Sequence, residues 1–109
     1  MLKPIDVSIS IVSHNTKRLL KHCLTSIFKY TQNVRFEVLV IDNASIDGSA
    51  AMVKREFTQV KLIRNRANRF YAAANNQGLK LARGRYFFIL NSDIVFKDNV
   101  IKKLIKFMD

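Results

Sequence analysis

The stretch Tyr86-Phe87-Phe88-Ile89-Leu90-Asn91-Ser92-Asp93 decides the fold class of this chain. Its five apolar residues are too few to cross a membrane, and such a run is typical of a parallel strand that is buried on both faces. The run then stops at three small polar residues, at the point where the strand is expected to end. Ligands of open α/β sheets bind beyond the carboxyl ends of the strands. Asn, Ser and Asp also form ordinary turns, so this segment alone does not identify a site.

The composition is that of one globular domain. The chain has 109 residues, of which 49% are hydrophobic, and this is enough for a single core. No apolar run approaches the ~20 residues that a membrane-spanning helix needs, and the first residues lack the apolar core of a secretion signal. Cys23 is the only cysteine, so an internal disulfide is impossible. We therefore expect a cytoplasmic domain, either free or peripheral on the inner face of the membrane.

The charge balance indicates anionic partners. Lys and Arg number 19 against 8 Asp and Glu, which gives a formal net charge of +11. Such a surface favours nucleic acid, an anionic membrane surface or a phosphorylated substrate. The chain lacks the basic segments interleaved with aromatic residues that stack single-stranded bases, so nucleic acid is the less favoured partner.

Strand and helix patterns alternate along the whole chain. Predicted strands and helices follow one another at 7–12, 19–28, 36–41, 49–57, 60–63, 70–81, 86–90 and 98–108. This β-α order predicts a three-layer α/β/α, Rossmann-like domain with a mainly parallel sheet and right-handed crossovers. With the strands numbered along the chain, we expect the order 3-2-1-4.

The helical segments carry more specific expectations. Asn15 or Thr16 is expected to cap the first helix, and Cys23 is expected to be a buried small hydrophobic residue on its apolar stripe. In the third helix, the residues expected to face the sheet are Ala74, Gly78 and Leu81, and Gly84 is expected to end that helix. The last helix carries an apolar stripe of Val100, Ile101, Leu104, Ile105 and Met108.

Polar residues follow all four predicted strands. They are Ser13-His14-Asn15, Asp42-Asn43, the basic run 64–69 and Asn91-Ser92-Asp93. Because the carboxyl ends of parallel strands meet at one edge of a sheet, these residues form a candidate binding site.

Several known phosphate-binding and catalytic motifs are absent. The three glycines form neither GxGxxG nor GxxxxGK[ST], so phosphate binding here would depend on a metal ion and basic side chains. A phosphate-receiving regulator would place an acidic pair after the first strand, where this chain has Ser13-His14. A hydrolase triad of Ser13, His14 and Asp42 lacks a nucleophile elbow, and adjacent Ser and His side chains are poorly placed to meet.

With these residues in place, the chain resembles the family 2 glycosyltransferases of the GT-A fold, and most closely their rhamnosyltransferase-like members. The matching segments appear in the order of the family and cover nearly the whole chain: 7–15, 40–49, Asn68 with 70–78, 82–86 and 90–93. Each segment is weak alone, and together they are specific.

The resemblance implies a nucleotide-diphosphate-sugar donor and assigns roles to residues. It implies that the nucleotide is bound by the strand ends and by residues that follow them: Val12, Ser13, His14, Asn15, Asp42, Asn43, Asn68, Asn75, Asn91 and Ser92. The D-x-D motif of the family reads Asn91-Ser92-Asp93 here, which leaves Asp93 as the ligand of Mg²⁺ or Mn²⁺. A second departure from the family pattern is Arg69, at a position where related sequences commonly have Gly.

The resemblance further implies that residues 1–109 are the N-terminal, donor-binding domain, ending before the acceptor half. The expected function is transfer of a hexosyl or rhamnosyl group from the donor to a polysaccharide or lipid-linked acceptor. The general base is expected beyond residue 109, so this chain by itself is expected to be inactive. The alternative is a non-catalytic module that binds a nucleotide sugar or nucleic acid. If the stripe of the last helix is uncovered, a homodimer is expected; if it packs on the chain's own sheet, a monomer.

Overall fold

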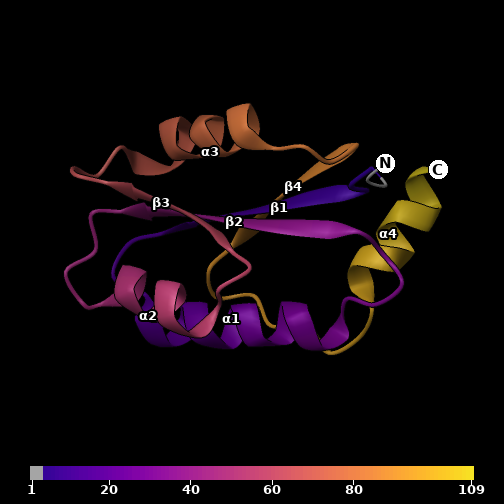
Figure 1. The fold of residues 1–109 in the computed structure, drawn as a ribbon, viewed down its shortest axis with the longest axis horizontal. Coiled ribbons are helices and arrows are strands. Elements are labelled where there is room, and N and C mark those ends of the chain that lie inside the picture. Colours follow the sequence, from indigo (N-terminus) through magenta and orange to yellow (C-terminus); the bar gives the residue numbers. More distant parts are fainter. Residues whose placement is uncertain (1–3) are drawn as a thin grey trace.

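The structure is a computed structural model that describes residues 4–109. Strands and helices alternate along these residues, as Figure 1 shows: β1 (Val7–Ser13), α1 (Lys17–Tyr30), β2 (Phe36–Asn43), α2 (Ser49–Glu56), β3 (Lys61–Asn65), α3 (Phe70–Leu81), β4 (Tyr86–Asn91) and α4 (Val100–Met108). No helix among them combines the length and the apolar character needed to cross a membrane.

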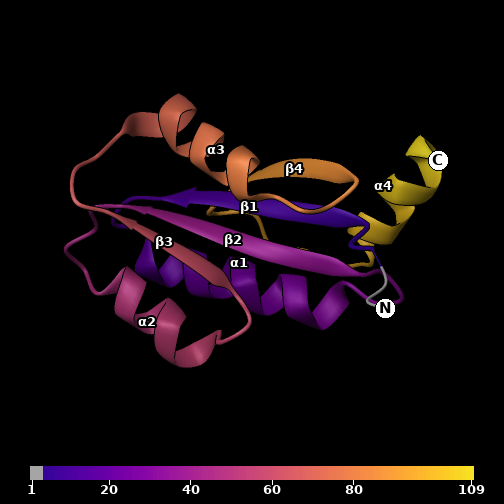
Figure 2. The ribbon, with the colours of Figure 1, turned by 45° about the horizontal axis from the view of Figure 1, so that its top comes forward.

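The four strands form one parallel sheet in the order β3-β2-β1-β4. Figure 2 shows α3 on one face of the sheet and α1 with α2 on the other, while α4 lies near the end of the sheet where β1 begins. The predicted three-layer α/β/α architecture and the predicted strand order are therefore confirmed.

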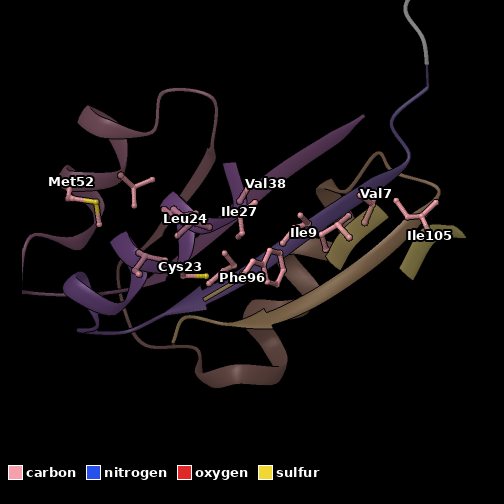
Figure 3. Packing of buried hydrophobic residues seen from close by; sticks show 14 residues of the cluster. Val7, Ile9, Cys23, Leu24, Ile27, Val38, Met52, Phe96 and Ile105 are labelled. Atoms are coloured by element: carbon pink, nitrogen blue, oxygen red, sulfur yellow. The ribbon is translucent and has the colours of Figure 1, made fainter. Parts of the chain in front are cut away.

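The main core lies between the sheet and α1, with α2 and α4 at its ends (Figure 3). The alternation of β1 directs Ile9 and Ile11 into this core, where they meet Leu24 and Ile27 of α1. All four side chains are fully buried, and each such burial stabilises the fold by roughly 1.5–3 kcal/mol. Cys23 is also fully buried, as expected.

The opposite face of the sheet accommodates α3 through small residues. Ala74 and Gly78 face the sheet as predicted, and a Cβ atom at Gly78 would lie 2.4 Å from Ser10 Oγ of β1. The expectation for Leu81 is wrong, because its side chain is 51% exposed. Asn75 is buried instead, so the packed side of α3 is centred on positions 74, 75 and 78, and Leu81 lies at its margin.

The strand β4 differs from its prediction. It pairs with β1 along one side and lies at the edge of the described sheet, so it is not buried on both faces. Phe88 and Leu90 pack against the core, whereas Ile89, which points to the other side, is 47% exposed. α3 lies over β1 and β2, which leaves that side of β4 open.

At two helix boundaries, the residue that was expected to cap or end the helix does not do so. Thr16 occupies the N-cap position of α1, but its side chain makes no capping bond to the helix. α3 ends at Leu81, before Gly84. The apolar stripe of α4 is covered only in part: Ile101 and Ile105 are buried, while Leu104 is 42% and Met108 is 52% exposed.

Gly84 has a packing role rather than a helix-ending one. Its amide donates to Ser8 Oγ at 2.8 Å, and a Cβ atom there would lie 2.5 Å from the Ser8 backbone nitrogen and 2.6 Å from the Val7 carbonyl carbon. Backbone atoms of a central strand cannot yield to this contact without shifting the strand itself.

We therefore predict that Gly84→Ala lowers the free energy of unfolding by roughly 1–3 kcal/mol, as overpacking does. Urea denaturation followed by circular dichroism measures it. The control is Lys80→Ala, on the exposed side of α3, which should stay within about 0.5 kcal/mol of the parent chain. Equal stabilities of the two variants would contradict the close contact.

Candidate functional site

A cleft lies at the carboxyl edge of the sheet. Its volume is about 330 Å³, within the range of roughly 300–1,000 Å³ that small-molecule sites occupy. The residues that line it come from the ends of β1 and β2, the segment before α3, the first turn of α3 and the turn after β4: Val12, His14, Thr16, Asn43, Asn68, Phe70, Tyr71 and Ser92. Four of these, His14, Asn43, Asn68 and Ser92, lie in the predicted polar strand ends, and Val12 was implied by the family resemblance.

Asn43 is a buried residue whose hydrogen bonds connect several segments of the cleft. Its side chain is 1% exposed; its Oδ1 accepts hydrogen bonds from Asn65 Nδ2 at 2.9 Å and from the Arg69 amide at 3.2 Å. Its Nδ2 donates to the Phe70 carbonyl at 3.0 Å, and its own carbonyl accepts from His14 Nδ1 at 2.6 Å. One buried residue thus fixes the loop before α3 and the segment after β1, on two sides of the same cleft.

These bonds define the state of His14. A carbonyl oxygen only accepts, so Nδ1 carries the hydrogen that reaches Asn43. Nε2 then accepts from Asn15 Nδ2 at 3.3 Å, while Asn15 Oδ1 accepts from the Ile46 amide at 2.8 Å. Asn15, which was predicted as a nucleotide contact, does not line the cleft; it positions the imidazole ring.

A chain of hydroxyl groups joins the ends of β1 and β4. Thr16 Oγ1 donates to Ser92 Oγ at 3.1 Å, so the bond of 2.9 Å between Ser13 and Thr16 receives its hydrogen from Ser13. Ser13 is 1% exposed and stays beneath the cleft. Thr16 was expected only as a helix cap, and the structure makes it part of the cleft wall.

Two predicted residues are buried beside the cleft with unpaired oxygens. Asp42 is 3% exposed; its Oδ2 accepts from the Ser45 amide at 3.1 Å, and its Oδ1 has no partner. Asn75 is 7% exposed and its Oδ1 also has no partner. Both oxygens are buried, neither residue lines the cleft, and an unpaired buried acceptor is costly in the free protein.

The end of β4 offers oxygen ligands for a cation. Asp93 is an exposed carboxylate, and the Asn91 amide and the Ser92 hydroxyl lie next to it in the chain. Residues 4–109 contain no cluster of three or more His, Cys, Asp or Glu side chains that could hold a metal ion. Mg²⁺ is commonly held by one or two carboxylates together with phosphate oxygens of a substrate, so this set fits a cation bound jointly with a phosphate group.

Cys23, beneath this turn, takes no part in such chemistry. Burial, and secondly the negative charge of Asp93, raises the pKa of its thiol to about 12. The thiol is therefore protonated at neutral pH and remains a core residue, as its position on the apolar stripe predicts.

Phe70 and Tyr71, like Thr16, are cleft residues that the strand-end pattern did not identify. Tyr71 donates through its hydroxyl to Asn91 Oδ1 at 3.4 Å and so reaches from α3 to the end of β4. Phe70 has a φ of 60°, whereas Arg69 has an ordinary φ of −92°. The glycine-like conformation of this loop therefore lies at Phe70, one residue after Arg69. The available signal was their position, directly after the polar run that follows β3.

Basic side chains surround this edge of the sheet. Arg64, Arg66 and Arg69 are exposed in and after β3, and Lys17 and Arg18 are exposed at the start of α1. They supply the positive charge that an anionic ligand of the cleft needs, in the absence of a glycine-rich phosphate loop.

Comparisons with known proteins identify the family and the fold of this chain. Residues 8–109 match the family model described as Glycosyl transferase family 2. Glycosyltransferase GlyG of Streptococcus pneumoniae is 32% identical over 102 residues, which are 90% of this chain and 33% of that protein. The Escherichia coli UDP-Glc:alpha-D-GlcNAc-diphosphoundecaprenol beta-1,3-glucosyltransferase WfgD is 33% identical over 94% of this chain and 40% of its own length. The chain thus spans about a third of the length of these relatives.

Solved structures share the fold. Staphylococcus aureus TarS 1-349 in complex with UDP has a TM-score of 0.87 at 23% identity, over 96% of this chain and 32% of that one. The mannosyltransferase PcManGT from Pyrobaculum calidifontis, in complex with GDP-Man and Mn²⁺, has a TM-score of 0.83 at 22% identity, over 99% and 35%. These matches confirm the predicted GT-A fold. Because the family model also covers nearly the whole sequence, this chain belongs to glycosyl transferase family 2.

Proposed function

We propose that this chain is the donor-binding part of a glycosyltransferase. The enzyme transfers a hexosyl or rhamnosyl group from a nucleotide-diphosphate-sugar to a polysaccharide or a lipid-linked acceptor. The observation that carries the proposal is the polar cleft at the carboxyl edge of a family 2 domain, with unpaired buried acceptors beside it. TarS structures with UDP and with UDP-GlcNAc, and the UDP-Glc in the name of WfgD, support a nucleotide-sugar ligand.

The nucleoside occupies the cleft in this proposal. Val12 and His14 form one wall, and Asn68 forms another. Asp42 Oδ1 accepts a hydrogen bond from the base or the ribose, and Asn75 Oδ1 is the second free acceptor. The remaining predicted residues act by holding this wall in place: Ser13, Asn15 and Asn43.

The diphosphate lies toward the end of β4. Asp93 binds Mg²⁺ or Mn²⁺ together with phosphate oxygens, and Asn91 and Ser92 supply neighbouring oxygen ligands. When bound, such a cation neutralises the diphosphate and stabilises the charge that develops on it as the sugar leaves. The structure of PcManGT with GDP-Man and Mn²⁺ supports this choice of cation. Arg66 and Arg69 add positive charge at the same edge.

The acceptor site and the general base belong, in this proposal, to polypeptide beyond residue 109. The chain matches about a third of the length of its relatives. The domain then binds donor without transferring it. Its place is the cytoplasm, peripheral on the inner face of the membrane, since the net charge of +11 suits an anionic bilayer and WfgD is named for a lipid-linked acceptor. The exposed side of Leu104 and Met108 is the candidate contact of a homodimer.

The first prediction tests the metal. A nucleoside diphosphate with Mn²⁺ should raise the melting temperature, because a ligand at 100 times its Kd stabilises the folded state by about 2.7 kcal/mol. Asp93→Asn should remove the Mn²⁺-dependent part of this rise and leave the unliganded melting temperature unchanged. Glu56→Gln, an exposed carboxylate at the end of α2, is the matched control. An Mn²⁺-dependent rise of equal size in Asp93→Asn would refute the role of Asp93.

The second prediction tests the nucleoside contact. Asp42→Ala should weaken binding of uridine or thymidine diphosphate about tenfold, in calorimetric titrations with or without metal, because a hydrogen bond to a charged group contributes roughly 1.5–3 kcal/mol. The comparison is Asp47→Ala, which removes a carboxylate that accepts from the Lys17 and Ser49 amides. That variant should lose ~1 kcal/mol of stability and no affinity. If Asp42→Ala also loses stability without losing affinity for the nucleoside diphosphate, Asp42 only stabilises the turn that follows β2.

A further inference from the structure

Phe70 adopts a backbone conformation that is unfavourable for a residue with a bulky side chain. Its φ of 60° lies in the left-handed region, which for a bulky residue is an outlier. The other non-glycine residues with positive φ are Asn15, Asn33 and Ala44, and two of these are the Asn type that tolerates it. Residues held in such conformations cluster at ligand sites.

The loop holds Phe70 in this conformation through both of its backbone polar groups. The Phe70 amide donates to Asn68 Oδ1 at 2.8 Å, and its carbonyl accepts from Asn43 Nδ2 at 3.0 Å. A glycine would adopt the same backbone without strain. Since the Phe70 side chain is 75% exposed, core packing does not explain why an aromatic ring is placed there.

The ring belongs to the cleft, and a second planar ring lines it too. Phe70 and His14 both line the cleft, and Asn43 bonds to both of them, through its side chain to Phe70 and through its carbonyl to His14. The same buried residue therefore holds the backbone of Phe70 and the ring of His14. Nucleobases present flat faces that stack on aromatic side chains, whereas a diphosphate gains nothing from a phenyl ring.

We infer that Phe70 determines nucleotide affinity by stacking its ring on the nucleobase of the donor, across the cleft from His14. This inference rests on the proposed function, since it requires a nucleotide in the cleft. It assigns to Phe70 a role that a glycine with the same backbone could not fill.

The test measures ligand binding by wild type and by two Phe70 variants that are chosen to keep the strained backbone. Phe70→Leu retains a side chain of similar bulk without a π-face, and Phe70→Trp enlarges the π-face. Wild type and both variants are titrated with uridine diphosphate, UDP-glucose and inorganic pyrophosphate, with guanosine and thymidine diphosphates as alternative bases. Phe107→Leu, at an 89% exposed phenylalanine on α4, is the matched control.

We expect Phe70→Leu to bind the preferred nucleoside diphosphate roughly tenfold more weakly, with pyrophosphate affinity unchanged. Phe70→Trp should bind it as well as wild type or better. The natural chain has no tryptophan, so the indole of Phe70→Trp is its only one. Its fluorescence should be quenched by the nucleoside diphosphate and not by pyrophosphate, a signal that a purely structural role of Phe70 would not produce.

Three results would overturn the inference while leaving the proposed function intact. They are equal nucleoside diphosphate affinity of wild type and Phe70→Leu, an equal loss for pyrophosphate, or a loss confined to UDP-glucose, which would place the ring on the sugar. Failure of the wild-type chain to bind any of the three nucleoside diphosphates would instead refute the proposed function, and this inference with it.

Discussion

The parallel register of the sheet is the constraint on which the site depends. It sets Ser13 opposite Asp42, Asp42 opposite Arg64, and Val12 opposite Asn91. Segments that are far apart in the sequence therefore leave the sheet at the same edge. Asn43, the last residue of β2, is buried there and bonds to His14 and to the loop before α3. Two residues that line the cleft are thus held by the backbone and the side chain of one strand residue, which makes the site as rigid as the sheet.

The two faces of the sheet contribute differently. The face toward α1 carries most of the large buried aliphatic side chains, whereas a smaller cluster of Leu39, Ile41 and Ala74 lies on the face toward α3. The face toward α3 has Ser8 and Ser10 of β1, and Gly78 lets the helix lie directly on Ser10. This close approach carries the first turn of α3, with Phe70 and Tyr71, to the cleft. A larger residue at Gly78 would lift the helix and widen the site, so the small-residue face is a geometric requirement of the cleft rather than a weaker core.

Local pattern was sufficient for the strands, their order and four of the residues that line the cleft, because polar residues at the carboxyl ends of parallel strands must converge; Val12 came only from the family resemblance. Local pattern was insufficient where burial or backbone conformation depends on tertiary contacts. The apolar run of β4 reads as a buried strand, yet its burial depends on neighbours that lie on one side only, and Ile89 is half exposed. The positive φ of Phe70 depends on hydrogen bonds between its backbone and the side chains of Asn68 and Asn43. No residue type in this segment predicts that conformation. Tertiary contacts likewise place Thr16 in the cleft wall and make Asn15 a support of the His14 ring.

The hydrogen bonds distinguish residues whose polar groups are all paired within the protein from residues that keep an unpaired buried oxygen. Asn43 uses both ends of its amide and belongs to the first group. Asp42 Oδ1 and Asn75 Oδ1 are buried without partners, and each such group costs about 1–3 kcal/mol. Ser10 and Thr31 also have unpaired hydroxyls, but a hydroxyl can turn toward other partners. A carboxylate oxygen has no hydrogen to redirect. In the proposed function, a donor group of the ligand pairs with this oxygen, and part of its cost in the free protein is recovered on binding.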